Sequence, residues 1–174
     1  LFARSAYREW RALTLPPMGV RRWRIAGTSP DGTRAAIVLD PSAVPSPMLL
    51  VDTGNGRPVA RLLERATQSS DAAFSPDARF VAAIGMPEEG LAVVEVVTGR
   101  VVFRRAIRGS LPCFSPEGRF LSVLTAERRF EVWDVERGEL VGAVPAEHPL
   151  VARPSTGGTS LVVPDGPRAT VSVW

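Results

Sequence analysis

The chain has 174 residues, 45% of them hydrophobic, so it is long enough and apolar enough for one globular domain. Its 21 basic residues are all arginine, and a net charge of only +3 argues against a nucleic-acid-binding face. One histidine and one cysteine exclude dyads of two histidines, His-rich or multi-cysteine metal sites and a disulfide framework, and no apolar run reaches the length of a membrane-spanning helix.

The first predicted element is a short strand at Trp10–Leu15, which matches the last strand of a unit that is repeated downstream. Residues 1–34 around it carry seven arginines against two acids, so the surplus positive charge lies at this end of the chain. We expect most of these arginines to be solvated surface.

The first complete copy of the repeated unit spans residues 23–63. It contains the turn Ser29-Pro30-Asp31-Gly32-Thr33, the apolar strand Ala35–Leu39, a loop over residues 40–47 with three prolines, and a second turn that begins at Val51-Asp52. Glycine in such turns supplies the positive φ that a tight reversal between strands needs. The unit therefore predicts strands joined by tight turns.

Further copies of the unit occupy residues 71–106, 111–144 and 151–174. The fourth residue of the first turn falls at positions 32, 78, 118 and 158, a period of 40 to 46 residues. In the clearest copy we predict four strands, at Leu111–Phe114, Phe120–Leu124, Phe130–Trp133 and Leu140–Val144. Four strands in about 40 residues is the size of one propeller blade. The chain is therefore predicted to be all-β, a β-propeller of four-stranded antiparallel blades.

The third copy resembles the WD40 repeat family. Trp133-Asp134 matches the dipeptide after which that family is named, and His148 stands at the place of the family's Gly-His pair, with Glu147 in place of the glycine. The first turn also resembles the TolB-type propeller repeats. The resemblance covers roughly residues 10–174, although the other copies replace the Trp-Asp pair by Val51-Asp52 and Val94-Glu95. It implies a propeller that binds a partner.

The predicted strands are enough to form about four propeller blades. Closure as a four-bladed ring, with Trp10–Leu15 pairing beside Thr170–Trp174, is one interpretation. We favour the other, a piece of a larger propeller, because the chain starts at Leu1 and stops inside a strand at Trp174.

Residues that recur in every copy are assigned structural roles, and no catalytic, cofactor-binding or metal-binding residue is predicted. An acid at the same place of each turn points to local Asx-type hydrogen bonding and not to an acidic ring. Recurrence assigns structural roles to Asp31, Gly32, Asp77, Glu117 and Gly118, and the resemblance to WD40 repeats implies structural roles for Trp133, Asp134 and His148 as well. The four tryptophans are expected in the core, and Cys113 is expected to be a small buried side chain.

Partner binding is predicted on the face that carries the divergent loops. In a propeller blade the connections from strand 2 to strand 3 and from strand 4 to the next blade emerge on one face, and the repeated turns emerge on the other. Divergent loops are where a partner is recognised. Six residues of that face are the predicted contact: Arg21, Arg22, Pro45, Pro47, Arg128 and Arg129.

The leading hypothesis is a non-catalytic WD40-like propeller, a protein-binding scaffold or sensor module of a larger bacterial protein that carries a protein partner or a fused signalling domain. The alternatives are the gating propeller of an enzyme, of the TolB-like peptidase or lactonase type, and a structural module of envelope assembly. A cytoplasmic location is favoured over a periplasmic one. Fold alone does not choose among these functions.

Overall fold

The computed structural model describes residues 22–40, 45–67, 69–146, 153–154 and 161–162. All regular structure in these residues is strand, arranged as three four-stranded antiparallel sheets and one two-stranded sheet. No helix long and apolar enough to span a membrane occurs among them. Each four-stranded sheet is built from strands that follow one another in the chain, and we call the three sheets the first, second and third blades.

The strand bounds are as follows. The first blade comprises β1 (Trp23–Thr28), β2 (Arg34–Leu39), β3 (Ser46–Asp52) and β4 (Pro58–Ala66). The second comprises β5 (Ala72–Phe74), β6 (Phe80–Ile84), β7 (Leu91–Glu95) and β8 (Val101–Arg105). The third comprises β9 (Gly109–Phe114), β10 (Phe120–Thr125), β11 (Arg129–Asp134) and β12 (Glu139–Pro145), and the hairpin of β13 (Arg153–Pro154) and β14 (Leu161–Val162) follows it.

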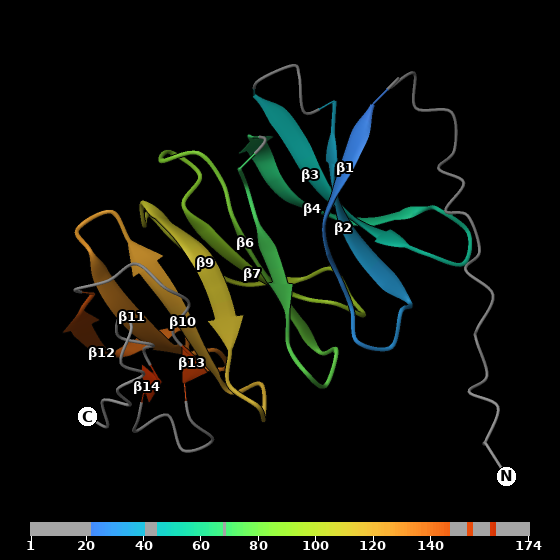
Figure 1. Cartoon of the computed structure of the whole chain (residues 1–174). Helices are drawn as coiled ribbons and strands as arrows, with labels where there is room; N and C mark the ends of the chain where they lie inside the picture. Colours follow the sequence, from blue (N-terminus) through green and yellow to red (C-terminus); the bar gives the residue numbers. More distant parts are fainter. Residues whose placement is uncertain (1–21, 41–44, 68, 147–152, 155–160, 163–174) are drawn as a thin grey trace, which may run out of the picture.

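The blades stand side by side in chain order, from blue through green to orange in Figure 1. The first strands of successive blades lie against one another, because β1 touches β5, β5 touches β9 and β9 touches β13. The first strand of each blade is therefore the inner one, nearest the common axis. The described residues form three blades of a β-propeller, which confirms the predicted fold class.

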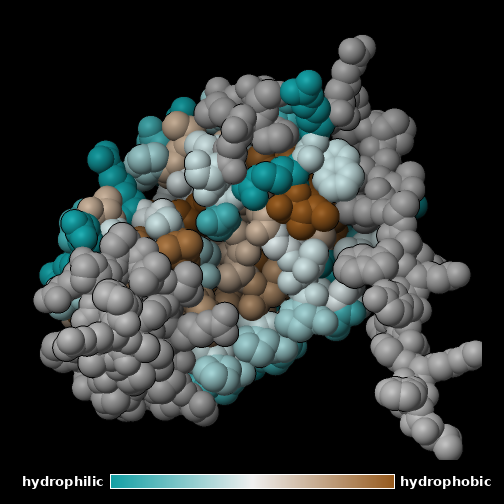
Figure 2. Space-filling view, viewed as in Figure 1, coloured by the Kyte–Doolittle hydropathy of each residue, from teal (hydrophilic) through white to brown (hydrophobic). Residues whose placement is uncertain are grey.

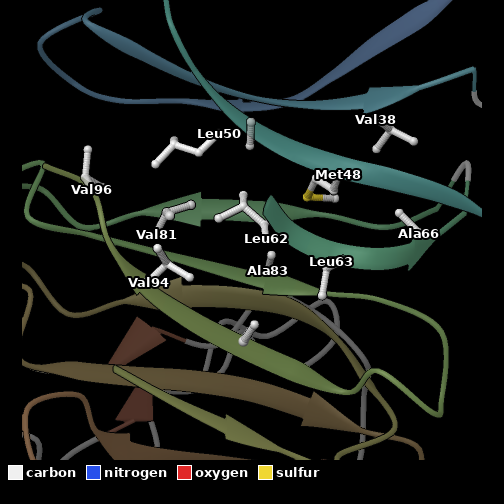
Figure 3. Close-up of a cluster of buried hydrophobic side chains, with 12 residues drawn as sticks. Val38, Met48, Leu50, Leu62, Leu63, Ala66, Val81, Ala83, Val94 and Val96 are labelled. Atoms are coloured by element: carbon white, nitrogen blue, oxygen red, sulfur yellow. The ribbon is translucent and has the colours of Figure 1, made fainter. Parts of the chain in front are cut away.

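Apolar side chains fill the space between neighbouring blades. Alternate residues of a strand point to opposite faces of its sheet, so Ala36 and Val38 of β2 face the second blade and share one buried cluster with Val81 and Ala83 of β6. Figure 3 labels Val38, Val81 and Ala83 of this cluster. The next layer joins the second blade to the third in the same way, with Leu121 and Val123 of β10 on the side of the third blade. The middle strands are consequently buried on both faces.

One part of the predicted loop at residues 40–47 is wrong. Pro47 lies in β3, half-buried, and not in a loop. A proline has no N–H for the β-ladder, but the pairing of β3 with β4 shifts register between Ser46 and Met48, which is where Pro47 lies. The strand accommodates the proline at this irregularity, and the neighbouring Pro45 is exposed just before β3.

Trp23 also differs from expectation, because 41% of its surface is exposed. It lies on β1, the inner strand of the first blade, whose one partner among the described strands is β2. Ile25, two residues further along the same strand and thus on the same face, is 46% exposed. Trp133 is buried as predicted. The predictions for Trp10–Leu15, Arg21, His148 and Thr170–Trp174 lie outside the described residues.

Candidate functional site

The repeated turns are organised around their first residue, a buried serine. The Ser29, Ser75 and Ser115 hydroxyls each accept a hydrogen bond from a backbone N–H five residues ahead and donate one to the acid two residues ahead. The N–H groups are those of Arg34, Phe80 and Phe120 at 2.9, 2.9 and 3.0 Å, and the acids are Asp31, Asp77 and Glu117 at 2.6, 2.6 and 2.9 Å. Sequence reasoning singled out the acids and missed the serines, although serine opens every copy of the turn.

The acids complete the turn locally. Asp31 and Asp77 accept hydrogen bonds from the backbone N–H of Thr33 and Arg79, at 3.0 and 3.1 Å, which is the Asx-type geometry expected from the sequence. The Ser29 hydroxyl and then the Thr33 N–H hold the pKa of Asp31 below its ordinary value. The next residue has a positive φ in every described copy, 71° at Gly32, 59° at Ala78 and 78° at Gly118.

The Trp-Asp pair of the third blade performs two structural functions. The Trp133 ring stacks on Phe103 of the second blade, with ring centroids 6.0 Å apart. Asp134 accepts hydrogen bonds at Oδ1 from the N–H groups of Glu136 and Arg137, both at 3.2 Å, and pairs with Arg119 at 3.0 Å. Burial opposes ionisation of Asp134, but the Arg137 N–H and the Arg119 guanidinium outweigh it, so the pKa of Asp134 lies below its ordinary value.

Arginine side chains link the blades through backbone carbonyls. Arg104 of β8 donates to the Leu62 carbonyl of the first blade at 3.1 Å, and Arg105 donates to the Gly138 carbonyl of the third blade at 2.6 Å. The Arg105 guanidinium also lies over the ring of Trp133, 5.5 Å from its centroid. These contacts join each blade to its neighbour near the outer strands.

The predicted partner-binding residues fall at two corners of the loop face. Arg22 and Pro45 flank the β2–β3 corner of the first blade, where the Asp40 N–H donates to the Arg22 carbonyl at 2.7 Å. Arg128 and Arg129 are exposed at the β10–β11 turn of the third blade, two blades away (Figure 1). They do not form one patch with the first corner, and Pro47 belongs to β3.

Two hollows lie between the blades in the described part of the chain. The inner strands β1, β5 and β9 line an axial cavity of about 410 Å³, which Asp71, Phe74 and Cys113 border. On the loop face a groove of about 480 Å³ is lined by Thr67, Met86, Pro87, Arg108, Ser110 and Thr125, among others, and we call it the inter-blade groove. Figure 2 shows apolar surface gathered toward the middle of the molecule, with polar residues around it. Sequence reasoning predicted neither hollow.

Within the described ranges, no group of three or more His, Cys, Asp or Glu side chains is placed to hold a metal ion. Cys113 is half-buried beside the axial cavity, less enclosed than the sequence predicts.

No protein-family model matches the sequence, and no curated protein matches it. Solved structures do match, and one is the Kuenenia stuttgartiensis hydrazine synthase, with 16% sequence identity and a TM-score of 0.51. The match covers 77% of this chain and 53% of that one, so the present chain spans about half the length of its match. At this identity the likeness shows a shared fold alone.

Proposed function

We propose that the chain is a WD40-like propeller module, a scaffold or sensor that binds a protein partner through the face carrying its divergent loops. The observation that carries the proposal is the difference between the two faces. On the turn face the serine hydroxyls and the turn acids are engaged in hydrogen bonds within their own turns. On the loop face the connections differ from blade to blade, and the inter-blade groove opens among them.

The assignment to WD40-like repeats is supported by the third blade. Its Trp133 packs into the layer between the second and third blades, and its Asp134 holds the following turn and pairs with Arg119. Asp52 of the first blade repeats the second function, because it accepts hydrogen bonds from the Gly54 and Asn55 N–H groups and pairs with Arg34 at 2.7 Å. The acid of the pair thus keeps its role where the tryptophan is replaced.

Site-specific photo-cross-linking in cells that produce the chain tests this function. A photoreactive amino acid at Glu88 or Ala126 of the loop face is expected to give a discrete cross-linked protein product. The same group at Arg57 or Arg100 of the turn face is the control and is expected to give none. Products from the turn face alone would contradict the proposal.

A charge reversal tests which corner of the loop face is used. Arg128→Glu with Arg129→Glu is expected to reduce the cross-linked product, whereas Arg57→Glu with Arg100→Glu is expected to leave it unchanged. Unchanged cross-linking in the first variant would remove this corner from the interface.

The axial cavity favours a second candidate, the gating propeller of an enzyme, because a propeller that controls access to an active site does so through its central channel. Thiol labelling at Cys113, the only cysteine of the chain, would report a molecule in that channel. Protection of Cys113 by a small substrate, with no cross-linking at the loop face, would favour this alternative.

A further inference from the structure

The inter-blade groove lies between the second and third blades, where the chain enters β9 and leaves β10. Met86 and Pro87 of the β6–β7 connection contribute apolar surface, and Arg108, Ser110 and Thr125 contribute polar groups from the third blade and the segment leading into it. Its volume of about 480 Å³ is that of a site for a small molecule or a few side chains.

Thr125 faces this groove from the end of β10. Leu121 and Val123 of the same strand pack toward the second blade, and Thr125, two residues further, points to the same side. Only 5% of Thr125 is exposed, and its hydroxyl makes no hydrogen bond of normal geometry. A buried hydroxyl without such a partner is unfavourable in the free protein and is satisfied by a ligand that offers an acceptor.

The corresponding position between the first and second blades is closed. The residue at this position is Gly85, which follows Ser75 by ten residues, just as Thr125 follows Ser115. A Cβ atom on Gly85 would lie 2.9 Å from the Arg65 carbonyl oxygen and 3.1 Å from Leu63. When the first two blades are aligned by strand register, Leu63 of β4 takes the position of Arg105 of β8. Strand β4 continues to Ala66, whereas β8 ends at Arg105. The shorter β8 leaves room on the side of Thr125.

The charge of the groove favours an anion. Arg108 is the one charged side chain among its lining residues. The nearby Glu127 is exposed at the β10–β11 turn, and its pKa is lowered by its own backbone N–H, by the Thr125 hydroxyl and by the Arg108 guanidinium. The Arg108 guanidinium thus favours the ionised form of a nearby carboxylate, and the Thr125 hydroxyl forms no hydrogen bond of normal geometry with Glu127.

We propose that the inter-blade groove binds a carboxylate side chain of an acidic, extended segment of a partner protein. Arg108 and the Thr125 hydroxyl bind the carboxylate in place of Glu127, and Met86 and Pro87 pack against the apolar residues beside it. The inference rests on the proposed partner-binding function and names the chemistry of the partner. Ion pairing in a groove with apolar walls gives such a segment both attraction and orientation.

Fluorescence anisotropy of the purified chain with a labelled octapeptide that alternates Glu and Leu is the test. We expect saturable binding that the matching Gln–Leu peptide lacks. Arg108→Gln is expected to weaken binding at least tenfold, and Thr125→Val, which keeps the shape of the side chain, about threefold to tenfold. Glu127→Gln is expected to strengthen it several-fold, because it removes the competing carboxylate. Arg57→Gln and Glu139→Gln, on the turn face, are the charge-matched controls.

Several results would overturn the inference. They are no saturable binding of the acidic peptide, equal weakening by Arg57→Gln and Arg108→Gln, and weakened binding in Glu127→Gln. If free glutarate binds as tightly as the peptide, the site is one for small dicarboxylates and the acidic segment is excluded. Thermal melts verify that each variant is folded. If Arg108→Gln does not fold, the peptide binding of Thr125→Val decides the test. Loop-face cross-linking without peptide binding would remove this inference and leave the proposed function standing.

Discussion

The serine that opens each repeated turn satisfies a backbone N–H and a carboxylate with one hydroxyl. Ser75 and Ser115 are fully buried, so this hydroxyl replaces the solvent that the turn would otherwise need. Because the partners lie within five residues, each turn is closed by its own sequence. At the residue scale, the turn therefore depends on two features, the serine and a residue that tolerates positive φ at the fourth position.

Ala78 tests the second feature, because it occupies with φ 59° the position that Gly32 occupies with φ 71°. A residue with a Cβ pays in steric strain there, partly offset by the greater chain entropy of glycine. We expect Ala78→Gly to raise the free energy of unfolding by about 0.5–1 kcal/mol and Gly32→Ala, where an added Cβ meets nothing within 4 Å, to lower it by a similar amount. Urea unfolding measures both, and changes of the same sign would contradict the assignment.

Asp134 gives a pH dependence. Its folded-state pKa is lowered from the ordinary 3.8, so its contribution to stability is present above that value and is lost as pH falls through the folded-state pKa. We expect Asp134→Asn to reduce the free energy of unfolding by about 1 kcal/mol at neutral pH, since it removes the charge that Arg119 pairs with. The difference from the unsubstituted chain should shrink as pH falls below 3.8 and vanish once Asp134 is protonated in the folded state. A difference that persists in acid would mean that packing, and not charge, is the cause.

The next scale is the blade and its elements. Gly138 ends the turn that precedes β12, with φ 65°, and a Cβ atom there would lie 3.1 Å from the Phe103 ring of the second blade. The glycine is thus required twice, by the turn and by the stack of Phe103 on Trp133.

Substitution of Gly138 separates this requirement from general strand effects. We expect Gly138→Ala to cost about 1–2 kcal/mol, more than Gly32→Ala, because it adds displacement of Phe103 to backbone strain. Gly142→Ala in β12, where an added Cβ meets nothing within 4 Å, is the control and is expected to be neutral or slightly stabilising. Urea unfolding of both variants measures the difference, and equal effects of the two substitutions would contradict the account.

Strands and turns of the blades could be predicted because their signals are local. For the third blade the predicted strands differ from β9–β12 by at most two residues at any end. Pro47 was misplaced because its strand tolerates proline only through a register shift that the sequence does not display. The inter-blade groove was missed for a similar reason. It exists because β8 ends earlier than β4 does, which leaves space beside the third blade. Contacts between blades depend on two repeats at once, so the sequence of one repeat does not predict them.

At the scale of the whole molecule, the strands best protected from solvent are the middle strands of the three blades. β2, β6 and β10 are buried almost along their whole length, whereas Leu140 and Val141 of the outermost strand β12 are 48% and 54% exposed. Hydrogen exchange should therefore be slowest in the three middle strands and fastest in β12. Amide exchange measured by mass spectrometry tests this order, and uniform protection across a blade would show that the blades open only as one unit.

The acceptors of Arg104 and Arg105 on the neighbouring blades are main-chain carbonyls, those of Leu62 and Gly138. A carbonyl is present at that position whatever side chain the residue carries. A duplicated blade therefore meets a compatible neighbour at once, before any side chain has adapted to it. Duplication or deletion of a repeat can in this way lengthen or shorten such a chain by whole units, and afterwards each copy remains free to diverge in its loops.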